Sequence, residues 1–89
     1  MTPVQIEAVT IDVLQQLDAV HPHGMKLDSL LTGLHQNDKR YVTSDRLASL
    51  IADLMDQQFV VSKGNTAVPE LKRYARTVQA RAWLTEYGI

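Results

Sequence analysis

Apolar residues recur every three or four positions over much of the chain, and this spacing predicts amphipathic helices. The first helix begins after Thr2, whose hydroxyl can cap it, and ends before Pro22, which disfavours helical geometry in the residue before it. A second helix follows Asp28, and a third extends over about 44–57 behind a hydroxyl-bearing cap residue. Their apolar stripes are formed by Ile6, Val9, Val13, Leu17 and Val20, by Leu30, Leu31 and Leu34, and by Leu47, Leu50, Ile51, Leu54 and Met55.

Short apolar segments between turn residues predict a small amount of β-structure. Residues 25–27 can pair as a short edge strand. Residues 59–62 and 66–68 predict a hairpin, because the residues 63–65 between them are typical of a turn. The predicted fold class is therefore mainly α with a small β-hairpin. Its predicted core consists of Ile6, Val9, Val13, Leu17, Leu30, Leu31, Leu34, Leu47, Leu50, Ile51, Leu54, Phe59, Val61, Leu71 and Val78.

The C-terminal segment is predicted as one helix from Pro69 to about Tyr87. Proline is favoured at a first helical position, and the helix formers alanine, arginine and glutamine predominate after it. A strand over residues 77–84, in which apolar residues alternate, is the alternative. In the helix, the face expected to pack on the domain carries Leu71, Tyr74, Ala75, Val78 and Ala82.

A second face of this predicted helix carries Arg76, Ala80, Trp83 and Tyr87. Tryptophan, tyrosine and arginine are enriched among the buried anchors of protein interfaces. A helix with apolar residues on two sides usually packs against two different surfaces. We interpret these four residues as a dimer or partner interface. A nucleic-acid surface, or simple packing on the same domain, are the alternatives.

The composition is that of one ordinary domain spanning residues 1–89, with 45% hydrophobic residues, 21% charged residues and no cysteine. The lack of cysteine excludes a disulfide framework, a thiol nucleophile and a thiolate zinc site. No apolar run reaches the ~18 residues of a membrane span, and the first residues lack the basic region of a signal peptide. We therefore expect a cytoplasmic protein that does not interact with membranes.

Residues suited to catalysis or metal binding are sparse. His21 and His23 lie in a turn without carboxylate neighbours, and His35 stands apart, whereas zinc needs three or four ligands at close range. Neither a Ser/His/Asp set, nor a glycine-rich phosphate loop, nor paired carboxylates at catalytic spacing can be assembled. We expect no enzymatic activity, no metal and no cofactor.

Charge is distributed unevenly along the chain, although the formal net charge is only −1. Residues 1–38 hold one lysine against five carboxylates, which is net −4, and residues 63–89 hold five cations against two carboxylates, which is net +3. The pI of about 6.2 is far below the value above about 9 that is typical of a uniformly basic nucleic-acid binder. Any contact with a polyanion must be local and confined to the middle and C-terminal parts.

The order of helix, short strand, helix, loop, helix and hairpin resembles the winged helix-turn-helix superfamily. The segment that carries the resemblance is Arg46–Val60, a leucine-spaced helix that leads through a polar turn into an aliphatic strand, together with Gly24–Leu31 upstream. The resemblance implies a winged-helix core over residues 3–68, with an added C-terminal helix over 69–87. Small members of this superfamily are frequent among bacterial and phage regulators of transcription.

The resemblance further implies binding to double-stranded DNA, with the third helix (about 44–57) in the major groove and the 59–68 hairpin as the wing. Arg46 could donate a bidentate pair to guanine, whereas Asp53 would be repelled by nearby phosphates. Helices one and four commonly form the dimer in such regulators, so the resemblance also implies a homodimer. The implied DNA-binding residues are Lys39, Arg40, Ser44, Arg46, Ser49 and Lys63.

A protein-binding winged-helix module, acting as an adaptor or a structural subunit, is the alternative function. It is favoured by the acidic N-terminal half of the chain and by the Trp83/Tyr87 face. The two functions differ in their surfaces. DNA binding requires a continuous positive surface, and an adaptor requires a larger apolar patch.

Overall fold

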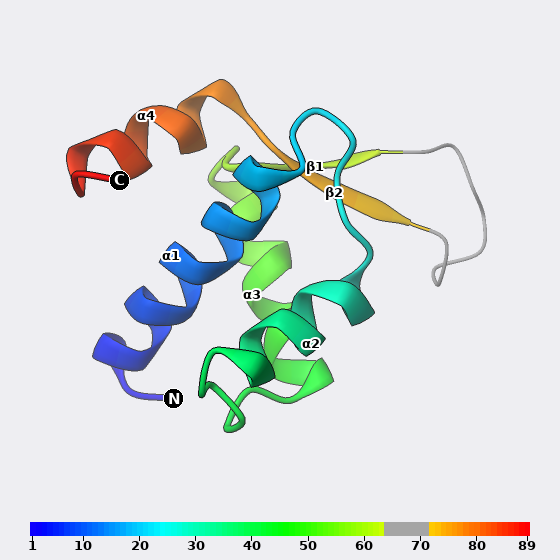
Figure 1. Cartoon of the computed structure of the whole chain (residues 1–89), viewed down its shortest axis with the longest axis vertical. Helices are drawn as coiled ribbons and strands as arrows, with labels where there is room; N and C mark the ends of the chain where they lie inside the picture. Colours follow the sequence, from blue (N-terminus) through cyan, green and yellow to red (C-terminus); the bar gives the residue numbers. More distant parts are fainter. Residues whose placement is uncertain (64–71) are drawn as a thin grey trace.

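The computed structural model describes residues 1–63 and 72–89, which form four helices and an antiparallel hairpin (Figure 1). The element order is that of a helix pair, a third helix, the hairpin and a last helix. The elements are α1 (Pro3–Ala19), α2 (Leu27–Gln36), α3 (Ser44–Asp56), β1 (Val60–Lys63), β2 (Arg73–Arg76) and α4 (Val78–Glu86). The prediction of a mainly helical fold with a small hairpin is confirmed.

The first three helices begin where the sequence predicts, with one difference at α2. Thr2 and Gln5 form a capping box at α1, in which each side chain accepts a hydrogen bond from the other residue's backbone N–H at 3.2 and 3.0 Å. Thr43 caps α3 by accepting from the backbone N–H of Arg46 at 3.2 Å. At α2 the cap is Lys26, without a side-chain hydrogen bond, and Asp28 lies in the first turn, where its charge suits the helix dipole.

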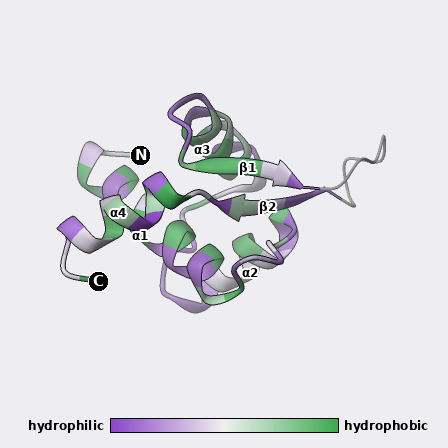
Figure 2. Cartoon of the chain, turned by 90° about the horizontal axis from the view of Figure 1, so that it is seen from above, coloured by the Kyte–Doolittle hydropathy of each residue, from purple (hydrophilic) through white to green (hydrophobic). Residues whose placement is uncertain are grey.

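One residue outside the hairpin, Met25, also pairs with the sheet. β1 pairs antiparallel with β2, with Val60 opposite Arg76 and Lys63 opposite Arg73. On the other edge of β2, Met25 and Tyr74 exchange both backbone hydrogen bonds at 2.8 Å. The prediction that residues 25–27 pair at an edge is thus confirmed at Met25. In Figure 2, β1 is hydrophobic where it begins over the helices and hydrophilic at its far end.

The predicted C-terminal helix from Pro69 to about Tyr87 is wrong at residues 73–77. Residues 73–76 form β2, and α4 begins only at Val78, where the Thr77 side chain accepts from the backbone N–H of Ala80 at 3.2 Å. The strand forms because its pairing with β1 and Met25 satisfies its backbone and buries Ala75, which outweighs local helix propensity. The return strand predicted at 66–68 lies outside the described residues, and β2 occupies that role.

Helix is confirmed over residues 78–84, so the alternative strand is not formed there.

The core lies between α1, α2 and α3 and is closed by β1, β2 and α4. Three predicted core residues are instead exposed: Ile6 by 41%, Val61 by 43% and Val78 by 82%. Val78 is exposed because the strand at 73–76 changes the rotation of the helix that follows. Leu31 and Phe59 are partly buried against the core, and Leu71 lies outside the described residues. Buried residues absent from the predicted core are Leu14, Val42, Val60, Ala75, Ala80 and Leu84.

The turn between α1 and α2 depends on a glycine. Gly24 has φ +80°, and a Cβ atom at this position would lie 2.7 Å from the carbonyl oxygen of Tyr74 in β2. Close approach of the turn to β2 is what allows Met25 to pair with Tyr74. Any larger residue would both strain the backbone and push the two segments apart.

We expect Gly24→Ala to lower the free energy of unfolding by about 2–4 kcal/mol, because a positive φ and a backbone clash combine. Gly88→Ala is the matched control, since Gly88 has φ +79° but a Cβ there would meet nothing within 4 Å. It should cost only about 1 kcal/mol. Urea denaturation of both variants measures the difference, and equal losses would show that the Gly24 contact with β2 has no role.

Candidate nucleic-acid interface

Three cations lie near one another at the end of the hairpin strands that is far from the helices. Lys63 ends β1 directly opposite Arg73, the first residue of β2. On the other side of β2, Met25 pairs with Tyr74 in an isolated bridge, so the next residue, Lys26, which caps α2, lies near Arg73. Directly opposed residues point to the same face of a sheet, and neighbouring strands are about 4.8 Å apart. Lys63 and Arg73 therefore share a face of the sheet, and together with the neighbouring Lys26 we call them the cation row.

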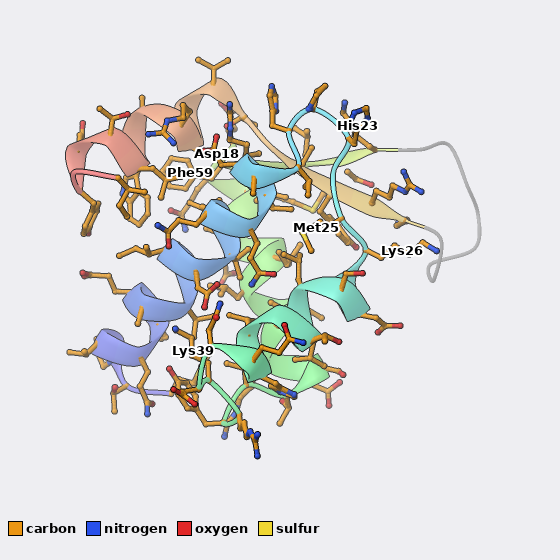
Figure 3. All side chains as sticks on the ribbon, in the orientation of Figure 1. Asp18, His23, Met25, Lys26, Lys39 and Phe59 are labelled. Carbon is orange, nitrogen blue, oxygen red and sulfur yellow. The ribbon has the colours of Figure 1, made fainter. Side chains whose placement is uncertain are left out.

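The turn after α1 supports one end of the cation row. The Nζ atom of Lys63 donates a hydrogen bond to the carbonyl oxygen of Pro22 at 2.6 Å. His23 of the same turn and Lys26 lie beside the hairpin in Figure 3. Lys72 directly precedes Arg73 and adds a fourth positive charge. Within residues 1–63 and 72–89, none of these four cations takes part in an ion pair.

Asp18, in the last turn of α1, fixes the position of β2 and α4. Its Oδ1 atom lies 2.5 Å from Nε of Arg76 at the end of β2, and its Oδ2 atom lies 2.8 Å from Nη1 of Arg81 in α4. Arg81 also donates to Thr85 at 3.3 Å and to the carbonyl oxygen of Ile89. One carboxylate therefore joins three elements, and Figure 3 shows it where α1 meets α4 and β2.

The two arginines make Asp18 more acidic. Partial burial raises the pKa of the Asp18 carboxyl, but the hydrogen bond from Arg76 and the positive charges of Arg81 and Arg76 outweigh this effect. Together they hold the pKa below its ordinary value of 3.8. The Asp18 side chain is 29% exposed, so this network is only partly shielded from solvent.

Lys39, predicted to bind DNA, instead holds the loop between α2 and α3. Its Nζ atom lies 3.1 Å from the carboxylate of Asp12 in α1, and the side chains are only 20% and 10% exposed. Asn37 donates to both oxygens of the same carboxylate at 3.1 Å. Lys39 also lies at the end of the molecule opposite His23 (Figure 3). Arg40, the next residue, is exposed.

The predicted DNA-binding residues of α3 do not adjoin the hairpin. Arg46 and Ser49 line a hollow of about 320 Å³ together with Met1 and Ile6, which places them on the side of α3 that faces α1. The guanidinium of Arg46 donates to the carbonyl oxygen of Tyr41 at 2.8 Å. Ser44 is exposed at the first position of α3. The six predicted residues therefore do not form one surface, and only Lys63 joins the cation row.

The exposed surface of α3 is acidic. It carries Asp45, Asp53 and Asp56 against Arg46, which is a net charge of −2 from three carboxylates and one cation. A phosphate brought close to this surface would be repelled.

The predicted interface of Arg76, Ala80, Trp83 and Tyr87 is also divided. Arg76 belongs to β2 and pairs with Asp18, and Ala80 is fully buried in the core. They do not share a helix face because α4 begins only after Arg76. Trp83 and Tyr87 do lie together, with ring centroids 4.6 Å apart, and Phe59 lies 5.8 Å from Trp83.

Sequence reasoning missed Lys26, Lys72 and Arg73. The signal was present in part, because residues 25–27 were predicted to pair at a sheet edge. The partner of that edge, residues 73–76, favours helix by its local sequence, so spacing alone does not place Arg73 opposite Lys63 or near Lys26.

The chain matches no protein-family model, and no curated protein or solved structure is similar enough to match it. Among the described residues, no helix is both long and apolar enough to cross a bilayer.

We expect Asp18→Asn to lower the free energy of unfolding by about 1–3 kcal/mol near neutral pH, because two charge-assisted hydrogen bonds are weakened. The pKa of Asp18 is lower in the folded chain than in the unfolded chain, so its contribution is present above the ordinary value of 3.8. It is lost as the pH falls through the folded-state pKa. Urea denaturation at several pH values between about 7 and about 2 measures this.

Glu7→Gln is the control for this comparison, since Glu7 is exposed on α1 and has no ion pair within the described ranges. It should change stability by about 0.5 kcal/mol or less. A difference between wild type and Asp18→Asn that stayed constant at all pH values would contradict the role assigned to the Asp18 charge.

Proposed function

We propose that this protein is a small winged-helix regulator that binds double-stranded DNA, with the hairpin as its wing. The cation row of Lys26, Arg73 and Lys63 is the observation that carries this proposal. Phosphate contacts by lysine and arginine supply most of the non-specific affinity of DNA-binding proteins. Lys63 and Arg73 share one face of the sheet, so both can meet the same stretch of a phosphate backbone.

The architecture supports a winged-helix assignment. A helix, a short paired segment, two further helices and an antiparallel hairpin follow one another in the order that the superfamily uses. Figure 1 shows the far ends of β1 and β2 on one side of the three-helix core, with α4 on the other side. A duplex at the far end of the strands would therefore lie away from α4.

The charge on α3 determines whether the helix or the hairpin contacts the DNA phosphates. Because the surface of α3 has a net charge of −2, its close approach to phosphates is unfavourable. Arg46 is directed to the α1 side and is held by the Tyr41 carbonyl oxygen. We therefore assign the phosphate contacts to the cation row at the far end of the strands and not to α3.

Fluorescence anisotropy of a labelled mixed-sequence duplex, measured between about 50 and about 200 mM salt, tests this division. Wild-type affinity should fall steeply with salt. Lys63→Ala and Arg73→Ala should each weaken binding to all sequences and reduce the slope of log K against log salt by about one, as expected when one phosphate contact is lost.

Arg46→Ala is the matched control, since it also removes one exposed positive charge but from the α1 side of α3. Its salt slope should equal that of wild type. A larger loss of slope for Arg46→Ala than for the hairpin variants would reverse the assignment. Absence of binding at about 50 mM salt would contradict DNA binding by this chain.

A further inference from the structure

An open groove runs along the molecule between α1, α3 and α4. It consists of two hollows of about 320 and about 370 Å³ that share Ile6, Leu50 and Asp53 as lining residues. One hollow reaches Asp45 near the start of α3, and the other reaches Gln57 just after its end. The groove therefore extends along the whole of α3, which is roughly 20 Å for a helix of this length.

The floor of the groove is apolar and partly open to solvent. Ile6 is 41% exposed there, and Leu50 contributes a nearly buried side chain. At the α4 end the floor is aromatic, because Phe59, Trp83 and Tyr87 all line the second hollow. Tyr87 is 46% exposed. Apolar side chains arranged along an elongated groove are suited to the apolar face of a helix.

The rim of the groove is acidic. Glu7 of α1 lines it on one side, and Asp45 and Asp53 of α3 line it on the other. Arg46 is the one lysine or arginine among the described lining residues, and its guanidinium is bound to the Tyr41 carbonyl oxygen. An occupant with positive charges beside its apolar face would match this rim, and the faces of Trp83 and Tyr87 also attract cations.

We propose that this groove binds a cationic amphipathic helix of a partner protein. Apolar residues of that helix, spaced at i, i+3, i+4 and i+7, pack on Ile6, Leu50 and the aromatic end. Its lysines or arginines lie against Glu7 and Asp53. A partner helix of about 12 residues spans the groove.

Nucleic acid and a second copy of this chain fit the groove less well than a cationic helix. Nucleic acid is disfavoured by the acidic rim. A second copy of this chain has no cationic amphipathic helix among its described residues, since Arg46 and Arg81 are the only lysines or arginines within the four helices. Its cation row lies on the hairpin, on the opposite side of the molecule from α4 (Figure 1).

The test uses two capped helical peptides of about 14 residues with leucine at i, i+3, i+4 and i+7. The first carries lysine and arginine at its other positions, and the second carries glutamate there. Trp83 is the single tryptophan of the chain and lines the groove, so its fluorescence reports binding. The cationic peptide should change the emission in a saturable way, and the glutamate peptide should not.

The variant Glu7→Gln/Asp53→Asn removes two rim charges and should lower the affinity for the cationic peptide by about tenfold or more. Asp56→Asn is the matched control, because Asp56 is an exposed carboxylate of α3 that does not line the groove. It should change the affinity by less than about twofold. Both variants should retain the circular dichroism spectrum of wild type and its affinity for DNA.

Three results would overturn the proposal. Equal binding of the two peptides, or equal affinity of the rim variant and wild type, would show that rim charge does not select the occupant. No change in Trp83 emission at millimolar cationic peptide would exclude this class of partner. Self-association in sedimentation experiments that is abolished by Trp83→Ala, but not by Asp56→Asn, would assign the groove to a second copy.

Discussion

The placement of the C-terminal part of this protein depends on one carboxylate, that of Asp18 at the end of α1. Arg76 and Arg81 bind its two oxygens from β2 and α4, which are separate elements. Once Arg76 is held there, β2 lies against Met25 and β1, and the strand register places Arg73 opposite Lys63. Once Arg81 is held there, Trp83 and Tyr87 face the groove beside α1. Both proposed binding surfaces therefore depend on the same ion-pair network.

A second carboxylate of α1 acts in a similar way nearer its middle. Asp12 binds Asn37 and Lys39 and so fixes the loop that leads into α3. The uneven charge distribution along the chain thus has a structural basis, because acidic residues of α1 pair with basic residues that come later. Lys26, Lys63, Lys72 and Arg73, which have no ion pair within the described residues, lie together near the far end of the strands. The overall net charge of −1 conceals this arrangement.

The first three helices could be predicted because each has a regular apolar stripe and a recognisable start. The C-terminal segment could not, because its local sequence favours helix while its structure is determined by distant partners. Residues 73–76 become a strand through Met25 and β1, which lie far away in the chain. A helix over these residues would place Arg76 and Ala80 on one face. The strand instead separates these two residues and pairs Arg73 with Lys63. Spacing alone also could not show that Lys39 is paired with Asp12.

Two sides of the molecule differ in chemistry, because the far end of the hairpin strands is basic and the groove is acidic with an apolar floor. The central claim is that DNA meets the hairpin side. Titration of the ¹⁵N-labelled protein with a short duplex, followed by backbone amide shifts, tests this most directly. The account predicts that the largest shifts cluster at Lys26, Lys63 and Arg73, with residues of the groove unchanged. Shifts centred on Arg46 and Ser49, with none at the cation row, would contradict it.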